Sequence, residues 1–241
     1  MTEKISGIVL NIRKYNDSNN IVTLYTRSHG RLSFISPVGK GKTGQVRRAL
    51  LQPLAVISTE FNYKATAELQ RLGSISTLEL WSHIYYHPVK RIMAMFISEF
   101  LYRLLNATMP DELLFDFLID SLRIFDRLDS GIPDFHIALL VGLLSYSGIQ
   151  PDVTGYESGK IFDFGSGGYV DPREFKGAGI SGEEAGYVKM VARLNFVNIK
   201  RLRLTNANRR QILYGLLNYY SFHFPGLGAL KSPEVLREIF E

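Results

Sequence analysis

The sequence predicts a mixed fold, with a small N-terminal β-barrel followed by a mainly α-helical domain. Three observations predict it. Residues 1–80 alternate apolar and polar side chains in short runs, as strands do. From about residue 83 the apolar residues recur with the period of a helix. Between residues 149 and 180 a stretch rich in Gly, Asp and Pro interrupts the helices, and this stretch predicts a small irregular insert containing short β-segments.

The first 80 residues contain five strand-like segments separated by turn signals. In the first segment Ile8, Leu10 and Ile12 alternate, which predicts that they share one buried face. Five short strands in about 80 residues are typical of an OB-fold barrel, which binds oligonucleotides across its open face. An SH3-like barrel also fits. The segments are residues 4–15, 20–27, 31–38, 50–61 and 65–75.

The helical part contains six segments with helical periodicity. The first is apolar nearly all round, which predicts a buried helix. Ser181 and Glu184 have the spacing of a capping box. We therefore predict two domains, an OB-fold over residues 1–80 and a helical domain over residues 81–241 that carries the insert. The predicted helices cover residues 88–106, 110–129, 133–148, 181–195, 206–224 and 232–240.

Charge is distributed unevenly along the chain. The net charge is +5, yet residues 1–80 hold eleven basic and five acidic side chains, a local excess of +6. Such asymmetry favours a polyanion-binding module, although a solvated basic face explains it equally well. With no cysteine in the chain, disulfides and thiolate metal sites are excluded. No apolar run approaches the ~20 residues of a membrane-spanning helix, so we expect a cytoplasmic, nucleoid-associated protein without a membrane partner.

The stretch SPVGKGKTGQVRRAL, residues 36–50, contains the Gly-Lys-Thr tail of a phosphate-binding P-loop at residues 41–43. The full motif requires a glycine where Ser36 stands and a long helix within a βαβ unit. A nucleotide-binding enzyme is therefore the weaker hypothesis. The same stretch also predicts a mobile basic loop for nucleic-acid phosphates, with a solvated loop as the alternative. Its bases are Lys40, Lys42, Arg47 and Arg48.

Aromatic and basic residues also alternate on the predicted strands. Arg13 and Tyr15 share one face, Tyr25 and Arg27 share another, and we expect both pairs to point outward. Aromatic stacking beside phosphate contacts is typical of sequence-tolerant single-strand binders. Ordinary aromatic residues at a barrel edge explain the pattern equally well.

Residues 185–233 contain no acidic side chain. This run could extend a DNA path, or it could bind an acidic peptide beside Tyr219, Tyr220 and Phe222. Alternatively, its bases pair with the acids of residues 110–134. The bases are Lys189, Arg193, Lys200, Arg201, Arg203, Arg209, Arg210 and Lys231.

Several short motifs are interpreted structurally. The literal G-x-G-x-x-G at residues 177–182 and the DFG at residues 163–165 lack the neighbouring elements that their chemistry needs. His83 and His87 have a zinc-ligand spacing but no third ligand. No catalytic serine–histidine–acid order or pair of carboxylates is evident. We therefore expect a binding protein rather than an enzyme, with no catalytic residue, cofactor or metal.

The order of these pieces resembles the bacterial recombination mediator RecO family. The stretch GIVLNIRKYNDSNNIVTLYTRSHGRLSFISPVGKG, followed by LLQPLAVISTEF, is similar to that family's opening. ILYGLLNYYSFHFPGLGALKSPEVLREI is similar to its C-terminal helices. The resemblance covers essentially the whole chain.

The resemblance implies an OB-fold, a helical domain and an insert within that domain. It also implies DNA repair by recombination: binding of single- and double-stranded DNA, strand annealing, and loading of the recombinase onto DNA coated with single-strand-binding protein. The implied partners are RecR and the acidic C-terminal tail of that coating protein. By the same resemblance, the DNA-binding residues are Arg13, Lys14, Arg27, Arg31, Lys40, Lys42, Arg47 and Arg48.

The insert departs from the family pattern. Many family members hold zinc there with four cysteines, and this sequence has no cysteine. We therefore expect a metal-free insert stabilised by the packing of Tyr156, Phe162, Phe164 and Tyr169.

Overall fold

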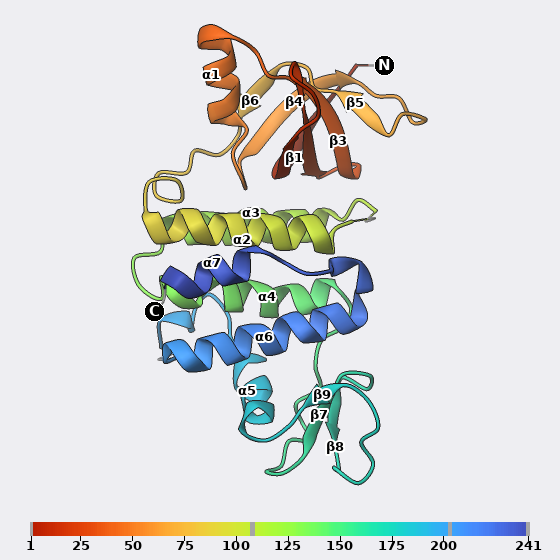
Figure 1. Ribbon diagram of the computed structural model, residues 1–241, viewed down its shortest axis with the longest axis vertical. Coiled ribbons are helices and arrows are strands. Elements are labelled where there is room, and N and C mark those ends of the chain that lie inside the picture. The colour runs from red at the N-terminus through yellow and green to blue at the C-terminus, as the bar shows by residue number, and fades with distance from the viewer. Residues whose placement is uncertain (1, 107–108, 202–203, 240–241) are drawn as a thin grey trace. The chain divides into compact units, whose positions relative to one another are not determined.

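The computed structural model describes residues 2–106, 109–201 and 204–239, and the chain divides into two compact units (Figure 1). Unit 1 is Met1–Asp126 and unit 2 is Arg127–Glu241. Unit 1 holds the large sheet and the helices α1 (Gly41–Leu50), α2 (Pro88–Leu104) and α3 (Glu112–Arg127), and unit 2 holds the later helices and the insert. Among the described residues, no helix is long and apolar enough to cross a membrane.

Unit 1 is built on a six-stranded sheet with the order β5-β3-β2-β1-β4-β6. Neighbouring strands are antiparallel, except that β3 and β5 are parallel. This arrangement confirms the predicted OB-fold and adds one short strand. The strands are β1 (Thr2–Lys14), β2 (Asn19–Thr26), β3 (Gly30–Pro37), β4 (Val56–Asn62), β5 (Leu69–Arg71) and β6 (Ile75–Thr77).

Two features correct the prediction of an all-β barrel. First, the sheet is not closed: β5 and β6 form its two edges, and each has three residues. Second, residues Gly41–Leu50 form helix α1 where we expected a mobile loop (Figure 1). Residues 45–50 are mostly good helix formers, but only Val46 and the last two residues of the helix are apolar, so no amphipathic period announces the helix.

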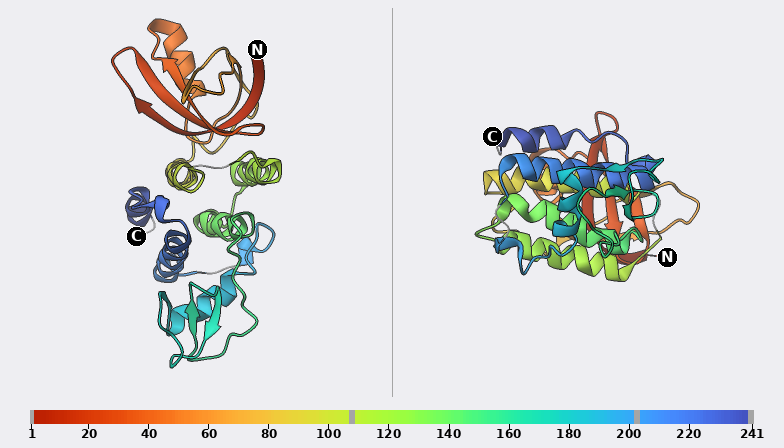
Figure 2. Two further views of the ribbon diagram at one scale, coloured as in Figure 1. Left: turned by 90° about the vertical axis from the view of Figure 1, so that its right-hand side faces the viewer. Right: turned by 90° about the horizontal axis from the view of Figure 1, so that it is seen from below.

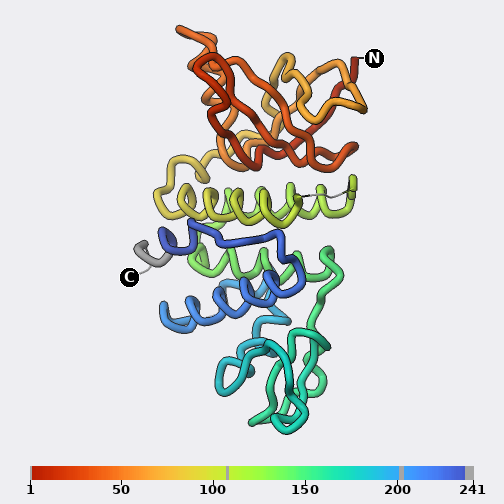
Figure 3. The backbone as a smooth tube through the Cα atoms, turned by 45° about the vertical axis from the view of Figure 1, so that its right-hand side comes forward, coloured from red at the N-terminus to blue at the C-terminus, as the bar shows by residue number. Residues whose placement is uncertain are grey.

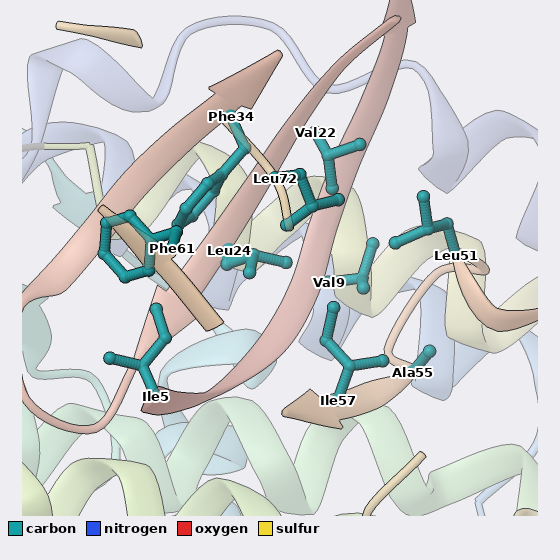
Figure 4. Packing of buried hydrophobic residues seen from close by; sticks show 10 residues of the cluster. All are labelled: Ile5, Val9, Val22, Leu24, Phe34, Leu51, Ala55, Ile57, Phe61 and Leu72. Carbon is teal, nitrogen blue, oxygen red and sulfur yellow. The ribbon is translucent and has the colours of Figure 1, made fainter. Parts of the chain in front are cut away.

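A β-bulge in β1 changes which side chains face the core. Ile5 and Val9 lie in the core before the bulge between Val9 and Asn11, and Ile12 packs against the same cluster after it. A bulge adds one residue to the strand and so shifts the alternation of faces. The prediction that Ile12 shares a face with Ile8 and Leu10 is therefore wrong. Figure 4 shows this core, in which the rings of Phe34 and Phe61 meet edge to face at 5.0 Å.

Helices α2 (Pro88–Leu104) and α3 (Glu112–Arg127) pack on the sheet within unit 1. The Ser98 hydroxyl on α2 donates a hydrogen bond of 2.6 Å to the Leu10 carbonyl of β1. The Tyr25 hydroxyl donates to the Asp111 carbonyl at 3.4 Å, and the Tyr25 ring lies 6.2 Å from that of Phe115. Ile8, Leu10 and Tyr25 are consequently buried on the other side of the sheet from the cluster shown in Figure 4.

A buried carboxylate joins the segment before α2 to the end of α3. The two Asp126 oxygens accept backbone N–H groups from Ser82, His83 and Ile84 at 2.8–3.0 Å. His83 Nδ1 lies 3.7 Å from the same carboxylate, and His87 is the N-cap of α2. Both histidines therefore have structural positions, in agreement with our interpretation of their spacing.

Unit 2 contains four α-helices among its described residues, and α4 and α6 run side by side (Figure 2). Helix α5 begins after Gly182, which has φ 64° and offers no side-chain cap. The predicted capping box at Ser181 and Glu184 is therefore wrong, because the chain turns one residue later than the box requires. The helices are α4 (Phe135–Tyr146), α5 (Glu183–Val191), α6 (Asn206–His223) and α7 (Ser232–Ile239).

The insert folds as a three-stranded sheet of order β8-β7-β9 (Figure 1). Its strands are β7 (Ile161–Asp163), β8 (Gly168–Val170) and β9 (Gly179–Ile180). The Phe162 and Tyr169 rings lie 5.4 Å apart, Tyr156 and Tyr169 lie 5.2 Å apart, and Phe164 contacts Tyr219 of α6 at 5.3 Å. The predicted aromatic packing is confirmed. Across the described ranges, no group of three or more His, Cys, Asp or Glu side chains is placed to hold a metal ion.

Candidate nucleic-acid interface

The ends of three strands bring two predicted basic segments together in unit 1. Lys14 near the end of β1 is opposite Asn20 of β2, and Asn20 is opposite Ser36 near the end of β3. The Val38 N–H donates to the Ser18 carbonyl at 2.9 Å, so the turn after β1 lies beside the segment that leads to α1. This pairing places Arg13 and Lys14 at the same end of the sheet as the segment carrying Lys40 and Lys42.

Two glycines fix the start of α1 against the preceding chain. Gly39 has φ 65°, which is strained for any residue with a side chain. A Cβ on Gly44 would lie 2.4 Å from the Gly39 carbonyl oxygen, so only glycine permits this approach. The glycines that we expected to admit an anion therefore shape the turn into α1. The first N–H groups of the helix carry a partial positive charge. No acidic residue in the first turn offsets this charge.

Five of the predicted bases are available to a ligand. The side chains of Arg13, Lys40, Lys42 and Arg48 are exposed and form neither an ion pair nor a hydrogen bond with the described part of the chain. Lys14 pairs with Asp17 at 2.7 Å, but both side chains are highly exposed, and such surface pairs contribute little. We define Arg13, Lys14, Lys40 and Lys42 as the strand-end cluster. Arg48 lies further along α1.

Arg27 and Arg31 are held by the helices of unit 1 instead. Arg27 forms a forked ion pair with Asp116 and also contacts Glu112 at 3.0 Å. The hydrogen bonds that Arg27 donates to Asp116 and, to a smaller extent, to Glu112 raise the pKa of Arg27. Arg31 donates to the Tyr102 carbonyl at 3.0 Å and to Asn106 at 2.7 Å, and its guanidinium lies 4.3 Å from the Tyr102 ring centroid.

Arg47 also has a structural role, with partners different from those of Arg27 and Arg31. Its Nε donates to the Ser36 hydroxyl at 2.9 Å, and its Nη2 donates to the Leu72 and Gly73 carbonyls, both at 3.2 Å. Burial lowers the pKa of Arg47. This side chain therefore ties α1 to β3 and to the segment after β5.

The two predicted outward aromatics differ. Tyr15 is 57% exposed at the strand-end turn, as expected. The prediction for Tyr25 is wrong: it is fully buried, because α3 covers its side of the sheet. OB-folds commonly bind oligonucleotides on the face of strands 2 and 3. Here, helix contacts to Tyr25, Arg27 and Arg31 occupy much of that face.

Replacing Arg27 by glutamine tests this division of the arginines. We expect the salt dependence of DNA binding to stay unchanged, because Arg27 is already neutralised by Asp116 and Glu112. Lys40→Gln removes the same charge from the strand-end cluster. This variant should make the logarithmic slope of binding against salt concentration shallower. The measurement is oligonucleotide anisotropy at several salt concentrations. Equal effects of the two variants would contradict the division.

The partial P-loop is followed by a helix, which is one of the structural elements that the full motif requires. Gly41, Lys42 and Thr43 do begin a helix, but that helix has ten residues. The flanking strands β3 and β4 are not neighbours in the sheet, and the chain of antiparallel pairs between them makes them run in opposite directions. A P-loop needs a βαβ unit with parallel strands. The geometry therefore does not favour a nucleotide site here.

Some of the basic residues between positions 185 and 233 have partners within unit 2. Arg209 forms a buried ion pair with Asp134 at 2.7 Å, and Lys189 lies 4.8 Å from the Tyr156 ring centroid. Tyr219 and Tyr220 are buried and donate hydrogen bonds to the Ile149 and Leu140 carbonyls. Of the three aromatics expected beside this run, only Phe222 is exposed. Arg203 lies outside the described residues, as does the side chain of Arg201.

Sequence reasoning missed one contribution to the interface. The N–H groups at the start of α1 belong to the backbone, and they become aligned donors only because residues 41–50 are helical. The Gly-rich composition of residues 39–44 was the available signal, and it indicated a loop equally well.

Comparison with known proteins gives the family. Residues 1–81 match the model described as "Recombination protein O N terminal", and residues 88–234 match "Recombination protein O C terminal". The chain is 33% identical over its full length to the full-length DNA repair protein RecO of Phocaeicola vulgatus. It is 34% identical to that of Porphyromonas gingivalis with 98% of each chain covered, and 32% identical to that of Bacteroides fragilis with full coverage of both. The chain therefore belongs to the RecO family of proteins, which act in DNA repair and recombination.

Proposed function

We propose that this chain binds DNA through the strand-end cluster and anneals complementary single strands. The observation that supports this proposal is the cluster of exposed lysine and arginine side chains, without strong internal partners, at the ends of β1 and β3. Contacts of lysine and arginine with phosphates are independent of sequence. Such contacts leave the nucleobases of the bound DNA strand free to pair. They also reduce the electrostatic repulsion between two approaching DNA strands. The same contacts do not distinguish single from double strands, so both are ligands.

Tyr15 adds a stacking surface at the same turn. Its ring is exposed and follows Arg13 and Lys14 directly in the chain. Stacking on a base contributes about 1–3 kcal/mol and tolerates any sequence. Arg48 lies on α1 and extends the positive surface away from the strand ends. A strand of DNA bound here would approach the sheet from its end rather than across β2 and β3.

We further propose that the chain helps load the recombinase onto DNA coated with single-strand-binding protein, with RecR as a partner. The acidic C-terminal tail of the coating protein is the proposed ligand of unit 2. Arg193, Lys200 and Arg210 are exposed there, and their segment of the chain contains no acid. Phe222, which is 46% exposed, offers an apolar contact. These partner assignments rest on family membership and on this charge distribution.

The test is anisotropy of a labelled single-stranded oligonucleotide, titrated at several salt concentrations. In the variant Arg13→Gln/Lys14→Gln/Lys40→Gln/Lys42→Gln, we expect affinity to fall and the logarithmic salt slope to become shallower. Each lost phosphate contact should change the slope by about 0.7. Annealing of complementary strands, followed by fluorescence energy transfer, should slow in parallel.

A charge-matched control separates a local site from a general electrostatic effect. Lys4→Gln/Lys64→Gln/Arg71→Gln/Arg91→Gln removes the same charge from exposed positions elsewhere in unit 1. In this control variant the logarithmic salt slope of oligonucleotide binding should remain close to that of the parent chain. An equal loss in both variants would contradict a site at the strand ends. Tight binding of ATP with magnesium that is lost in Lys42→Gln alone would favour the nucleotide enzyme instead.

A further inference from the structure

Helix α1 has few apolar contacts that could hold it in place in unit 1. Among its ten residues only Gly44, which packs on Gly39, is buried, while Arg47 and Leu50 are half-buried. Val46 is 59% exposed. A helix of this length is marginal by itself and usually depends on an apolar face that packs against the protein. The position of α1, whose path between β3 and β4 can be followed in Figure 3, therefore depends on its other contacts.

Arg47 supplies three such contacts. The hydroxyl of the buried Ser36 on β3 accepts a hydrogen bond from Nε at 2.9 Å, and the carbonyls of Leu72 and Gly73 accept from Nη2 at 3.2 Å. The donors of a guanidinium are fixed in one plane, so acceptors on two sides restrict its position more than a single bond would. Arg47 thus holds the second turn of α1 against two separate segments of unit 1.

This anchor lies in line with the strand-end cluster. Ser36 is opposite Asn20 of β2, and Asn20 is opposite Lys14 of β1. The acceptor of Arg47 Nε is therefore in the same row across the sheet as Lys14. Lys42 precedes Arg47 by five residues, which is about 7.5 Å along a helix axis. A movement of α1 on the sheet would consequently change the distance between the lysines of the helix and the basic residues of β1.

The two ends of α1 are attached independently of Arg47. Before the helix, the Val38 N–H donates to the Ser18 carbonyl at 2.9 Å, and directly after the helix Leu51 packs in the core cluster. Removal of the Arg47 side chain would therefore leave α1 connected to the sheet, but without the hydrogen bonds that hold its second turn. The lysines at its start would then occupy a wider range of positions.

Arg47 is poorly placed to be a direct ligand of a phosphate. Its Nε and Nη2 groups already donate to protein acceptors, and burial lowers its pKa because the charged form is partly removed from water. The exposed Lys40 and Lys42 are better placed for such contacts.

We propose that Arg47 is a positioning residue for DNA binding, which holds α1 on the sheet so that Lys40 and Lys42 contact the same DNA strand as Arg13 and Lys14. This inference rests on the proposed function of the strand-end cluster. It assigns Arg47 an indirect role in place of the direct DNA contact that the sequence predicted. Side chains that are already ordered lose less conformational entropy on binding, so a fixed α1 increases the affinity.

The test is a double-mutant cycle, measured by anisotropy of a labelled single-stranded oligonucleotide at several salt concentrations. Arg47→Met removes the three hydrogen bonds and should lower the affinity. It should also make the logarithmic salt slope shallower by more than about 0.7, the value for one lost phosphate contact, because both lysines of α1 lose their placement. In the background Lys40→Gln/Lys42→Gln the same substitution should have much less effect, since residues that act through one another are not additive.

Arg48→Met is the matched control, because it removes the same charge from an exposed position of the same helix. Its effect on the affinity should be equal in the two backgrounds. Ser36→Ala removes one acceptor of Arg47 without changing the charge, and it should lower the affinity in the same non-additive way by a smaller factor. This variant preserves the test if Arg47→Met disturbs the whole of unit 1, which the fluorescence of Trp81 during urea unfolding would reveal.

Hydrogen exchange of the α1 amides tests the anchor without DNA. Exchange should be faster in Arg47→Met than in the parent chain, and it should be unchanged in Arg48→Met. Additive losses of affinity in the cycle, or unchanged exchange in Arg47→Met, would overturn the positioning role and leave the strand-end cluster as proposed. Unchanged DNA binding in Lys40→Gln/Lys42→Gln would instead overturn the cluster as a DNA site, and the positioning role with it.

Discussion

Replacing Arg209 by methionine is expected to lower the free energy of unfolding of unit 2 by about 3–5 kcal/mol, the usual effect of removing one partner from a buried ion pair. Arg209 Nε lies 2.7 Å from Asp134 Oδ1, and the two side chains are 10% and 5% exposed. Arg209 also donates to Asn206 at 2.7 Å and to the Leu204 carbonyl at 3.2 Å. Its loss leaves a buried carboxylate without its countercharge.

The pH dependence follows from the Asp134 carboxyl. Burial raises its pKa, and the hydrogen bond and charge of Arg209 partly oppose this rise. A raised acid pKa means that the folded state binds the proton more tightly than the unfolded state, so stability increases as the pH falls through the folded value. Without Arg209 the pKa rises further. The loss in Arg209→Met should therefore be largest at neutral pH and smaller in acid.

Hydrogen exchange of α4 and α6 amides is the appropriate measurement, because the single tryptophan, Trp81, reports on unit 1. Arg210→Met is the matched control, since it removes an exposed charge from the same helix. It should change the exchange rates little. The double variant Arg209→Met/Asp134→Leu removes both charges and should recover part of the stability. An Arg210 variant as unstable as the Arg209 variant would contradict the assignment.

The comparison of sequence and structure shows which features depend on local information. The helices of unit 2 and the long strands of unit 1 were predictable, because each is a run of eight or more residues whose apolar content is read from consecutive positions. Helix α1 was not. The hydrogen bonds of Arg47 tie this helix to distant residues, namely Ser36, Leu72 and Gly73.

The candidate interface shows the same limit. Composition located the basic excess in residues 1–80, but it could not separate free bases from paired ones. Arg27 meets Asp116, which lies 89 positions away, and Arg31 meets Tyr102, 71 positions away. Charge pairing over such separations is set by the packing of α2 and α3 on the sheet. The bulge in β1 is similar, since one extra residue reversed the faces that simple alternation predicts for Ile12.

Replacing Asp126 by alanine is expected to destabilise unit 1 by about 1–3 kcal/mol, the usual cost of leaving a buried N–H group without an acceptor. The buried group is the Ile84 N–H, and the partly buried N–H groups of Ser82 and His83 lose the same acceptor. Trp81 stands directly before them and donates to the Leu54 carbonyl at 3.0 Å. Its fluorescence during urea unfolding therefore measures the effect, and Asp129→Ala, at an exposed position three residues later in the chain, is the control.

The pH dependence at Asp126 has the opposite sign to that at Asp134. Burial raises the pKa of Asp126, but the N–H donors of His83, Ile84 and Ser82, with the charge of His83, outweigh it and hold the pKa below the ordinary value of 3.8. A depressed acid pKa stabilises the fold above the unfolded-state value, and this stabilisation is lost as the pH falls through the folded value. Asp126→Ala should therefore differ most from the parent chain at neutral pH and converge with it in strong acid. A constant difference across that range would mean that packing of the side chain, rather than its charge, stabilises the junction before α2.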